Sequence, residues 1–197
     1  MRNEIIVLCG KSSTGKDTIA NELSKLGYNF IVSHTTRPKR SGEMHGKPYW
    51  FIDDFKMREL KDQDKLLEIR EYNTLVNNIE ETWYYAVHKD AVMYSNRYVV
   101  VLDSIGLEAF KEHFGDRVQS FHIRTPNKER TQRAKERGSF DISEWNRRLK
   151  ADKQDFKNII CDYTVRNSGN KYICLGNILE QIGKNLDNKI YSEKESK

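Results

Sequence analysis

Apolar residues along the chain gather in short runs that alternate with amphipathic stretches. The run EIIVLC at Glu4–Cys9 is followed by Gly10 and is typical of a strand buried on both faces. Apolar residues then recur at helical spacing until Gly27, which predicts a helix. The run YVVVL at 98–102 predicts a second central strand. Strand and helix therefore alternate from the start of the chain.

The same patterns predict the other elements. Further strands are expected at 30–33, 65–72, 83–87, 118–123 and 163–166. Further helices are expected at 53–61, 106–114, 127–137, 142–158 and 179–186, with a frayed tail over 187–197. Strands that alternate with helices predict a three-layer α/β fold, in which a parallel central sheet carries ligands at the carboxyl ends of its strands.

The middle of the chain departs from this alternation. A polar, basic loop at 34–48 is followed by short strands, which predicts a small lobe at 34–96 inserted into a core formed by 1–33 and 97–186. A chain of 197 residues is long enough for one such domain with its own core.

Charge and cysteine usage narrow the classes of partner. The net charge of +5, without a dense run of Lys or Arg, favours a pocket for small polyanions over nucleic acid. Cys9, Cys161 and Cys174 are too far apart for a disulfide framework, so we interpret them as buried residues of an intracellular protein. We find no signal peptide or membrane span, and therefore expect a cytoplasmic protein without a membrane partner.

A phosphate-binding motif follows the first strand. GKSSTGK at 10–16 fits GxxxxGK between a strand and a helix, as a P-loop requires. Its backbone N–H groups would form an anion nest at the positive end of the helix, and Lys16 would reach the β- and γ-phosphates of ATP. The candidate ATP-binding residues here are Gly10, Ser12, Ser13, Thr14, Gly15, Lys16, Asp17 and Thr18.

Two acids are candidate Mg²⁺ ligands. The position after Lys16 usually carries a hydroxyl for Mg²⁺, but here it is Asp17. Asp17 would hold the ion directly or through water, or would only stabilise the helix N-terminus. Asp103 ends the run at 98–102, where it would orient Mg²⁺ or would only cap the next helix.

The loop at 33–43 carries the second strong motif. Arg37 and Arg40 are three residues apart and could grip one phosphate, with Ser33 and Tyr49 as neutral donors. The alternative is a basic loop that is merely solvated.

The motif TTRPxRxGE, followed by a Gly and Tyr49, closely resembles the guanylate kinases, which convert GMP and ATP to GDP and ADP. The resemblance extends from Ile5 to about Ile182. It implies the P-loop fold with an acceptor lobe and a helical lid, ATP with Mg²⁺ as cofactors, and GMP or dGMP as acceptor. It also implies that the GMP phosphate is bound by Ser33, Arg37, Arg40 and Tyr49, that Tyr85 contacts it too, and that Glu68 pairs with the guanine N1–H and amino group.

The resemblance further implies a lid at about 133–148. Arg133 and Arg137 are four residues apart on one helix face, and Arg148 matches another family arginine. With Lys16 and Arg37, these arginines form the expected catalytic set, which neutralises charge on the transferring phosphoryl group. Asn167 falls where the family contacts adenine.

Two departures from the family pattern concern the base. Ala86 and Val87 stand where the family usually has Gly and a hydroxyl residue that helps to read guanine, and the stretch from Glu68 to Tyr85 is longer than expected. The alternatives are therefore a kinase for another nucleotide or a ribose phosphate, or a non-catalytic phosphopeptide-binding module, which would have a decayed P-loop. The expected partners are ATP and a nucleoside monophosphate, not nucleic acid, with the chain as a monomer or homodimer.

Overall fold

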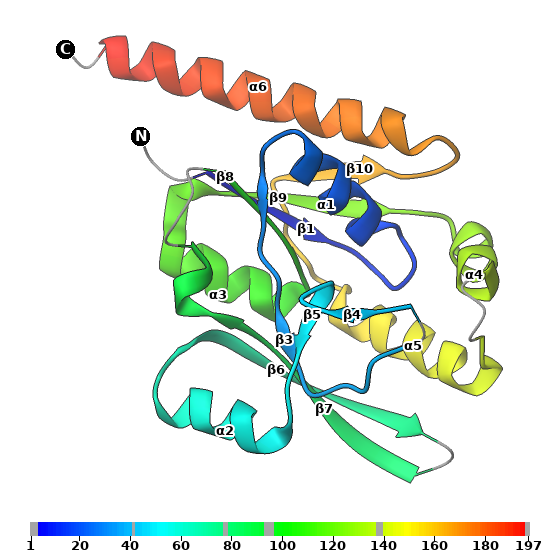
Figure 1. Ribbon diagram of the computed structural model, residues 1–197. Coiled ribbons are helices and arrows are strands. Elements are labelled where there is room, and N and C mark those ends of the chain that lie inside the picture. The colour runs from blue at the N-terminus through cyan, green and yellow to red at the C-terminus, as the bar shows by residue number, and fades with distance from the viewer. Residues whose placement is uncertain (1–3, 41, 77–78, 93–96, 137–139, 196–197) are drawn as a thin grey trace.

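The computed structural model describes residues 4–40, 42–76, 79–92, 97–136 and 140–195. A parallel five-stranded sheet lies at the centre of this part of the chain (Figure 1), in the order β10-β9-β1-β8-β2. Its strands are β1 (Glu4–Cys9), β2 (Asn29–Phe30), β8 (Arg97–Leu102), β9 (Val118–Arg124) and β10 (Tyr163–Arg166).

Helices cover both faces of this sheet. Along β1, Ile6 and Leu8 pack toward α1 (Lys16–Lys25) and α6 (Lys171–Glu195). Ile5 and Val7 point the other way and pack with α3 (Ser104–Phe114). Because alternate residues of a strand face opposite sides, a continuous apolar run is what a doubly covered strand requires. The predicted three-layer fold is confirmed.

A second sheet is built from residues inside the segment expected to form the lobe. Its order is β4-β5-β3-β7-β6. The strands are β3 (His34–Thr35), β4 (Met44–His45), β5 (Pro48–Phe51), β6 (Leu66–Val76) and β7 (Ile79–His88), and α2 (Asp54–Asp62) joins β5 to β6. The short 3₁₀ helix Lys89–Val92 leads back toward β8, and another, Gly115–Arg117, joins α3 to β9.

Beyond β9, two helices form the region expected to be the lid. They are α4 (Asn127–Glu136) and α5 (Ile142–Asp155). The carboxylate of Asp141 caps α5 by accepting from the backbone N–H of Glu144 at 2.7 Å. In Figure 1, α5 passes close to the carboxyl ends of the central strands and the β6–β7 hairpin.

Three expected elements are corrected. The strand expected at 30–33 is only Asn29–Phe30, because after Ile31 bonds to Val99 the chain crosses to the second sheet. Residues 73–76 and 79–82, expected to lie between two strands, belong to the hairpin ladder. Ladder bonds join backbone groups, so polar side chains do not prevent them. The helix expected at 179–186 begins at Lys171, because apolar side chains from Cys174 onward pack against the core, and it continues through the expected frayed tail to Glu195.

Among the described residues, no helix is both long enough and apolar enough to cross a membrane.

Candidate active site

The P-loop leaves β1 in a conformation that points its backbone toward the cleft. Gly10 passes so close to β9 that a Cβ there would lie 2.4 Å from the carbonyl oxygen of Ile123. Ser13 and Gly15 have φ angles of 61° and 89°, in the left-handed region. Alternation of such residues curls the chain into an anion nest, and α1 begins directly behind it.

Lys16 lies along the inside of this loop. Its Nζ donates to the carbonyl oxygens of Gly10 at 2.6 Å and Lys11 at 3.1 Å. Burial lowers the pKa of the Lys16 ammonium, while nearby Asp17 and Asp152 oppose that shift. The Lys16 ammonium is therefore held inside the loop by two carbonyl acceptors, which phosphate oxygens can replace when a ligand binds.

The back of the P-loop is held by residues expected to contact ATP. The carbonyl oxygen of Thr14 accepts from Asn167 Nδ2 at 2.7 Å and from Arg133 Nη1 at 3.2 Å. Both Thr14 and Asn167 are buried. In this structure Thr14, Arg133 and Asn167, like Thr18, lie outside the lining of the cleft. Their contacts with ATP stay predictions, and Arg137 lies outside the described residues.

The other predicted site residues line one continuous cleft. They are Gly10, Ser12, Ser13, Gly15, Lys16, Asp17, Ser33, Arg37, Arg40, Tyr49, Glu68, Tyr85, Asp103 and Arg148. The two sequence motifs, expected to serve two different ligands, therefore open into the same space.

On the acceptor side of the cleft, Arg37 is fixed and Arg40 is exposed. Arg37 is 3% exposed, and it donates to Glu43 Oε1 at 2.9 Å and to the carbonyl oxygen of Pro38 at 2.7 Å. Its guanidinium also lies 5.5 Å from the ring centre of Tyr49. Tyr49 packs edge-on against Tyr85 at 5.6 Å. These contacts hold one cation rigidly and leave the other free to approach a ligand.

Strand β6 presents alternate residues to the cleft. Glu68, Arg70 and Tyr72 all line it, as the period of two in a strand requires. Burial, with a smaller contribution from Asp103, raises the pKa of the Glu68 carboxyl to about 8. Val87, by contrast, is fully buried in the core on the α3 side of the sheet.

The two candidate metal ligands differ in their surroundings. Asp103 Oδ1 caps α3 by accepting from the backbone N–H of Gly106 at 2.9 Å, and Oδ2 accepts from Arg70 Nε at 2.9 Å. Asp17 is exposed at the first turn of α1 and lines the cleft. No group of three or more His, Cys, Asp or Glu residues in the described part of the chain could hold a metal by itself.

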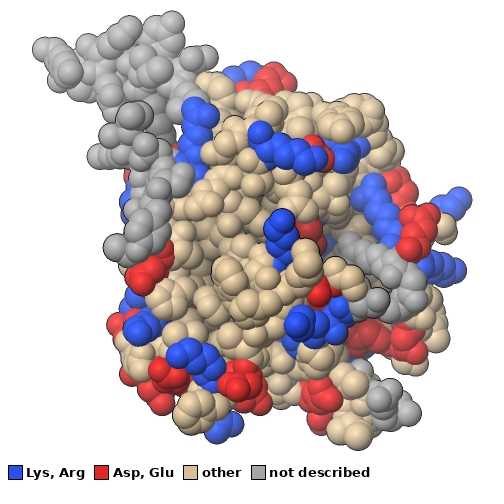
Figure 2. All heavy atoms as spheres, viewed as in Figure 1, with Lys and Arg blue, Asp and Glu red and all other residues tan. Residues whose placement is uncertain are grey.

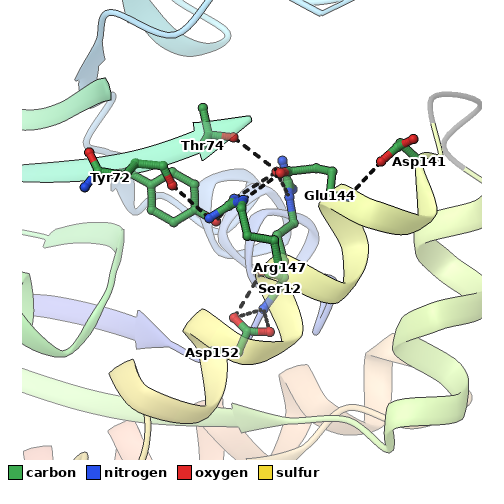
Figure 3. Close-up of polar contacts among 9 residues, drawn as sticks. Ser12, Tyr72, Thr74, Asp141, Glu144, Arg147 and Asp152 are labelled. Atoms are coloured by element: carbon green, nitrogen blue, oxygen red, sulfur yellow. Dashed lines mark hydrogen bonds and ion pairs between the residues drawn. The ribbon is translucent and has the colours of Figure 1, made fainter. Parts of the chain in front are cut away.

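Sequence reasoning missed the residues that attach α5 to the rest of the site. Asp152 accepts from the backbone N–H of Ser12, and Arg147 donates to the hydroxyl of Tyr72 at 2.5 Å (Figure 3). Glu144 accepts from Thr74 at 3.3 Å and from Arg148 at 2.7 Å. The only signal was the spacing of Arg148 and Asp152, four residues apart on an expected helix.

Comparison with known proteins places the chain in a family. The sequence model of guanylate kinase matches residues 2–186. The chain belongs to the guanylate kinase family. A guanylate kinase of Francisella tularensis subsp. holarctica is 28% identical over 153 residues, which are 73% of this chain and 76% of the relative. One from Syntrophomonas wolfei is 42% identical over 66 residues, so the match spans about a third of each chain, 32% and 34%.

The fold is shared within and beyond this family. The crystal structure of guanylate kinase from Anaplasma phagocytophilum has a TM-score of 0.64 at 23% identity, covering 95% of this chain and 86% of the other. A gluconokinase from Sinorhizobium meliloti reaches a TM-score of 0.57 at 13% identity. Since kinases with such different names share the fold, the acceptor must be argued from the site.

The charges on the face shown in Figure 2 are mixed. On the face shown in Figure 2, Lys and Arg lie among Asp and Glu, and no continuous basic band covers the described part of that face. Inside the cleft, the lining includes five cations: Lys16, Arg37, Arg40, Arg70 and Arg148.

Proposed function

We propose that this protein transfers the γ-phosphoryl group of ATP to the phosphate of GMP or dGMP, giving ADP and the nucleoside diphosphate. The observation that carries the proposal is the single cleft that joins Lys16 of the P-loop to Arg37 and Arg40 of the acceptor loop. A donor triphosphate and an acceptor phosphate bound there would lie in the same space.

In this mechanism the protein positions the reactants and neutralises charge. The nest N–H groups and Lys16 hold the β- and γ-phosphates, and Arg37 and Arg40 hold the acceptor phosphate. An oxygen of that phosphate attacks the γ-phosphorus in line with the leaving ADP oxygen. Arg148, which lines the same cleft, faces the charge that spreads over the transferring group. No covalent intermediate with the protein is needed.

Asp17 fits a Mg²⁺ site completed by phosphate oxygens and water. Mg²⁺ is commonly bound through one or two carboxylates with several waters, and Asp17 offers a carboxylate at the cleft. When bound, the ion would reduce the negative charge of the phosphates. Asp103 would act on its water shell, since both of its carboxylate oxygens already accept protein hydrogen bonds.

Base recognition would rest on β6. Ionised Glu68 accepts from the guanine N1–H and amino group, and Arg70, two residues further on the same face, supplies a donor toward the O6 and N7 acceptors. Arg70 would take the place of the hydroxyl expected at position 87, where Val87 is buried away from the cleft.

Val87 also favours a second candidate, a kinase for another nucleoside monophosphate. The non-catalytic module is disfavoured by the complete P-loop and its Lys16. We further propose that the chain acts as a monomer or homodimer. We also propose that it acts on free nucleotides in the cytoplasm, without nucleic acid as a partner.

An ADP-release assay with ATP and a panel of acceptors tests the proposal. The panel contains GMP, dGMP, AMP, UMP, CMP, dTMP and ribose phosphates. We expect turnover with GMP and dGMP, and a loss of about 10²–10³ in kcat for Lys16→Ala without loss of the fold, because Lys16 contacts the transferring charge. If only another monophosphate turns over, the assignment of guanine as the base is wrong and the assignment as a kinase stands. Near-normal turnover by Lys16→Ala would reject the mechanism.

A further inference from the structure

The most deeply buried cation among the described residues, Arg130 on α4, has no part in the mechanism above. It is 1% exposed and pairs with Asp152 of α5, which is 6% exposed. Arg130 Nε also donates to the carbonyl oxygen of Ser12 at 2.7 Å, and Nη1 donates to Asn127 at 3.0 Å. The indole of Trp145 lies 5.7 Å from the guanidinium.

Asp152 binds the same P-loop residue from the other side. Its Oδ1 accepts from the Ser12 backbone N–H at 2.9 Å and from the Ser12 hydroxyl at 3.1 Å, and its Oδ2 lies 3.1 Å from the same nitrogen. Ser12 therefore has its N–H, hydroxyl and carbonyl all bonded to one buried ion pair. This contact joins residues 140 positions apart.

The contacts of Arg130 and Asp152 with Ser12, called the clamp below, also determine where α5 lies. Asp152 follows Arg148 by four residues, so both lie on the same face of α5, and both line the cleft. At the N-terminal part of this helix, Arg147 and Glu144 bond to Tyr72 and Thr74 of the hairpin (Figure 3). The helix that carries Arg148 is thus attached to both walls of the cleft.

We propose that Asp152, held by Arg130, is a positioning residue that sets the distance between the P-loop and Arg148. This inference rests on the proposed function. If Asp152 moved away, Arg130 would be buried without its counter-ion. The ion pair therefore stays closed throughout the catalytic cycle. An apolar pair of similar volume would usually support the fold as well as a buried ion pair does. What the ion pair adds is a fixed geometry at Ser12.

Two variants separate position from stability. Asp152→Asn removes the charge, and Arg130→Met with Asp152→Leu replaces the pair by apolar side chains. For both we expect kcat to fall by about a hundredfold, the effect of misplacing a reacting group by about 1 Å. The KM for GMP should stay within about twofold, because the acceptor loop is untouched. The double variant should melt close to the unmodified protein.

Asp162 provides a matched control. It accepts from both the N–H and the hydroxyl of Ser120 at 2.7 Å and pairs with Lys111 at 2.9 Å, and it lies outside the lining of the cleft. Asp162→Asn removes the same kind of contact and should leave kcat unchanged. Amide hydrogen exchange at Ser12 should be faster in Asp152→Asn and unchanged in Asp162→Asn.

A folded double variant with unmodified kcat would overturn the inference, as would unchanged exchange at Ser12 in Asp152→Asn. If the unmodified protein turns over none of the monophosphates, the proposed function fails. The exchange rate of the Ser12 amide still tests the clamp in that case, since it requires no acceptor.

Discussion

At the scale of single residues, Glu68 gives the site a pH dependence. The pKa of its carboxyl is raised to about 8 by burial and by Asp103, so the free protein holds this proton at neutral pH. If Glu68 reads guanine as proposed, the proton must leave before both oxygens can accept from the base. The KM for GMP should therefore fall as pH rises from 6 to 8, by up to about tenfold per unit well below the pKa, and then level off.

Steady-state rates across this range, with the KM for ATP measured in parallel, check the effect. Glu68→Gln cannot ionise, so its KM for GMP should be high and should not show this pH dependence. A KM for the unmodified protein that rises toward pH 8 would contradict the role of Glu68 as an ionised acceptor.

Ser13 stores strain in the P-loop. Its φ of 61° is left-handed, and this conformation costs a residue with a Cβ about 1–2 kcal/mol. Gly avoids that cost but loses about 0.5–1 kcal/mol of conformational entropy on folding. Ser13→Gly should therefore raise the free energy of unfolding by roughly 0.5–1 kcal/mol. Ser24→Gly, inside α1, should lower it by a similar amount. Urea denaturation of both variants measures these free energies of unfolding. A lower value for Ser13→Gly would show that Ser13 is not strained.

At the scale of elements, the N-terminus of α1 meets the cleft through Asp17. Gly15 occupies the N-cap position without a side-chain hydrogen bond, and Asp17 lies in the first turn. If Asp17 holds Mg²⁺, Asp17→Ala should raise the Mg²⁺ concentration for half-maximal rate, and Asp17→Ser should restore much of the activity. Asp17→Asn should remain impaired, because a hard cation depends on the carboxylate charge.

The helix-terminal alternative for Asp17 makes a different prediction. A charge near the N-terminus of an exposed helix contributes about 0.3–1 kcal/mol, so its loss would lower the melting temperature and leave the Mg²⁺ requirement unchanged. Mg²⁺ titrations of rate beside thermal melts distinguish the two roles.

At the scale of the whole molecule, the two sheets contribute opposite walls to one cleft. Lys16 follows a strand of the central sheet, and Glu68 lies on the second sheet. A compound in which adenosine and guanosine are joined through a phosphate chain should occupy both halves at once. Linked ligands gain from the high effective concentration of the second half. Its affinity should exceed that of an ATP analogue or GMP alone by about 10²-fold or more.

Calorimetry and the rise in melting temperature at equal ligand concentrations measure this gain. The matched compound with adenosine at both ends is the control, and it should gain much less if Glu68 reads guanine. Equal affinity for the joined compound and for the ATP analogue would mean that the two halves are not occupied together.

The sequence by itself determined the fold class and the two motifs. A P-loop is a contiguous segment whose conformation follows from its glycines and from the strand and helix that flank it, and the apolar pattern of β1 requires cover on both faces. The loop with Arg37 and Arg40 was recognised for the same reason, since its chemistry is carried by neighbours in the chain.

Tertiary structure alone decided which distant residues support those motifs. Arg130 and Asp152 close around Ser12, Asn167 supports Thr14, and Arg70 bonds to Asp103. None of these contacts leaves a periodic pattern in the sequence, because each depends on how the topology brings distant segments together. The outer part of the hairpin, residues 73–76 and 79–82, was missed for a related reason: a backbone ladder forms whether its side chains are apolar or polar. Local patterns specify local geometry, and contacts between distant residues exist only once the topology has brought them together.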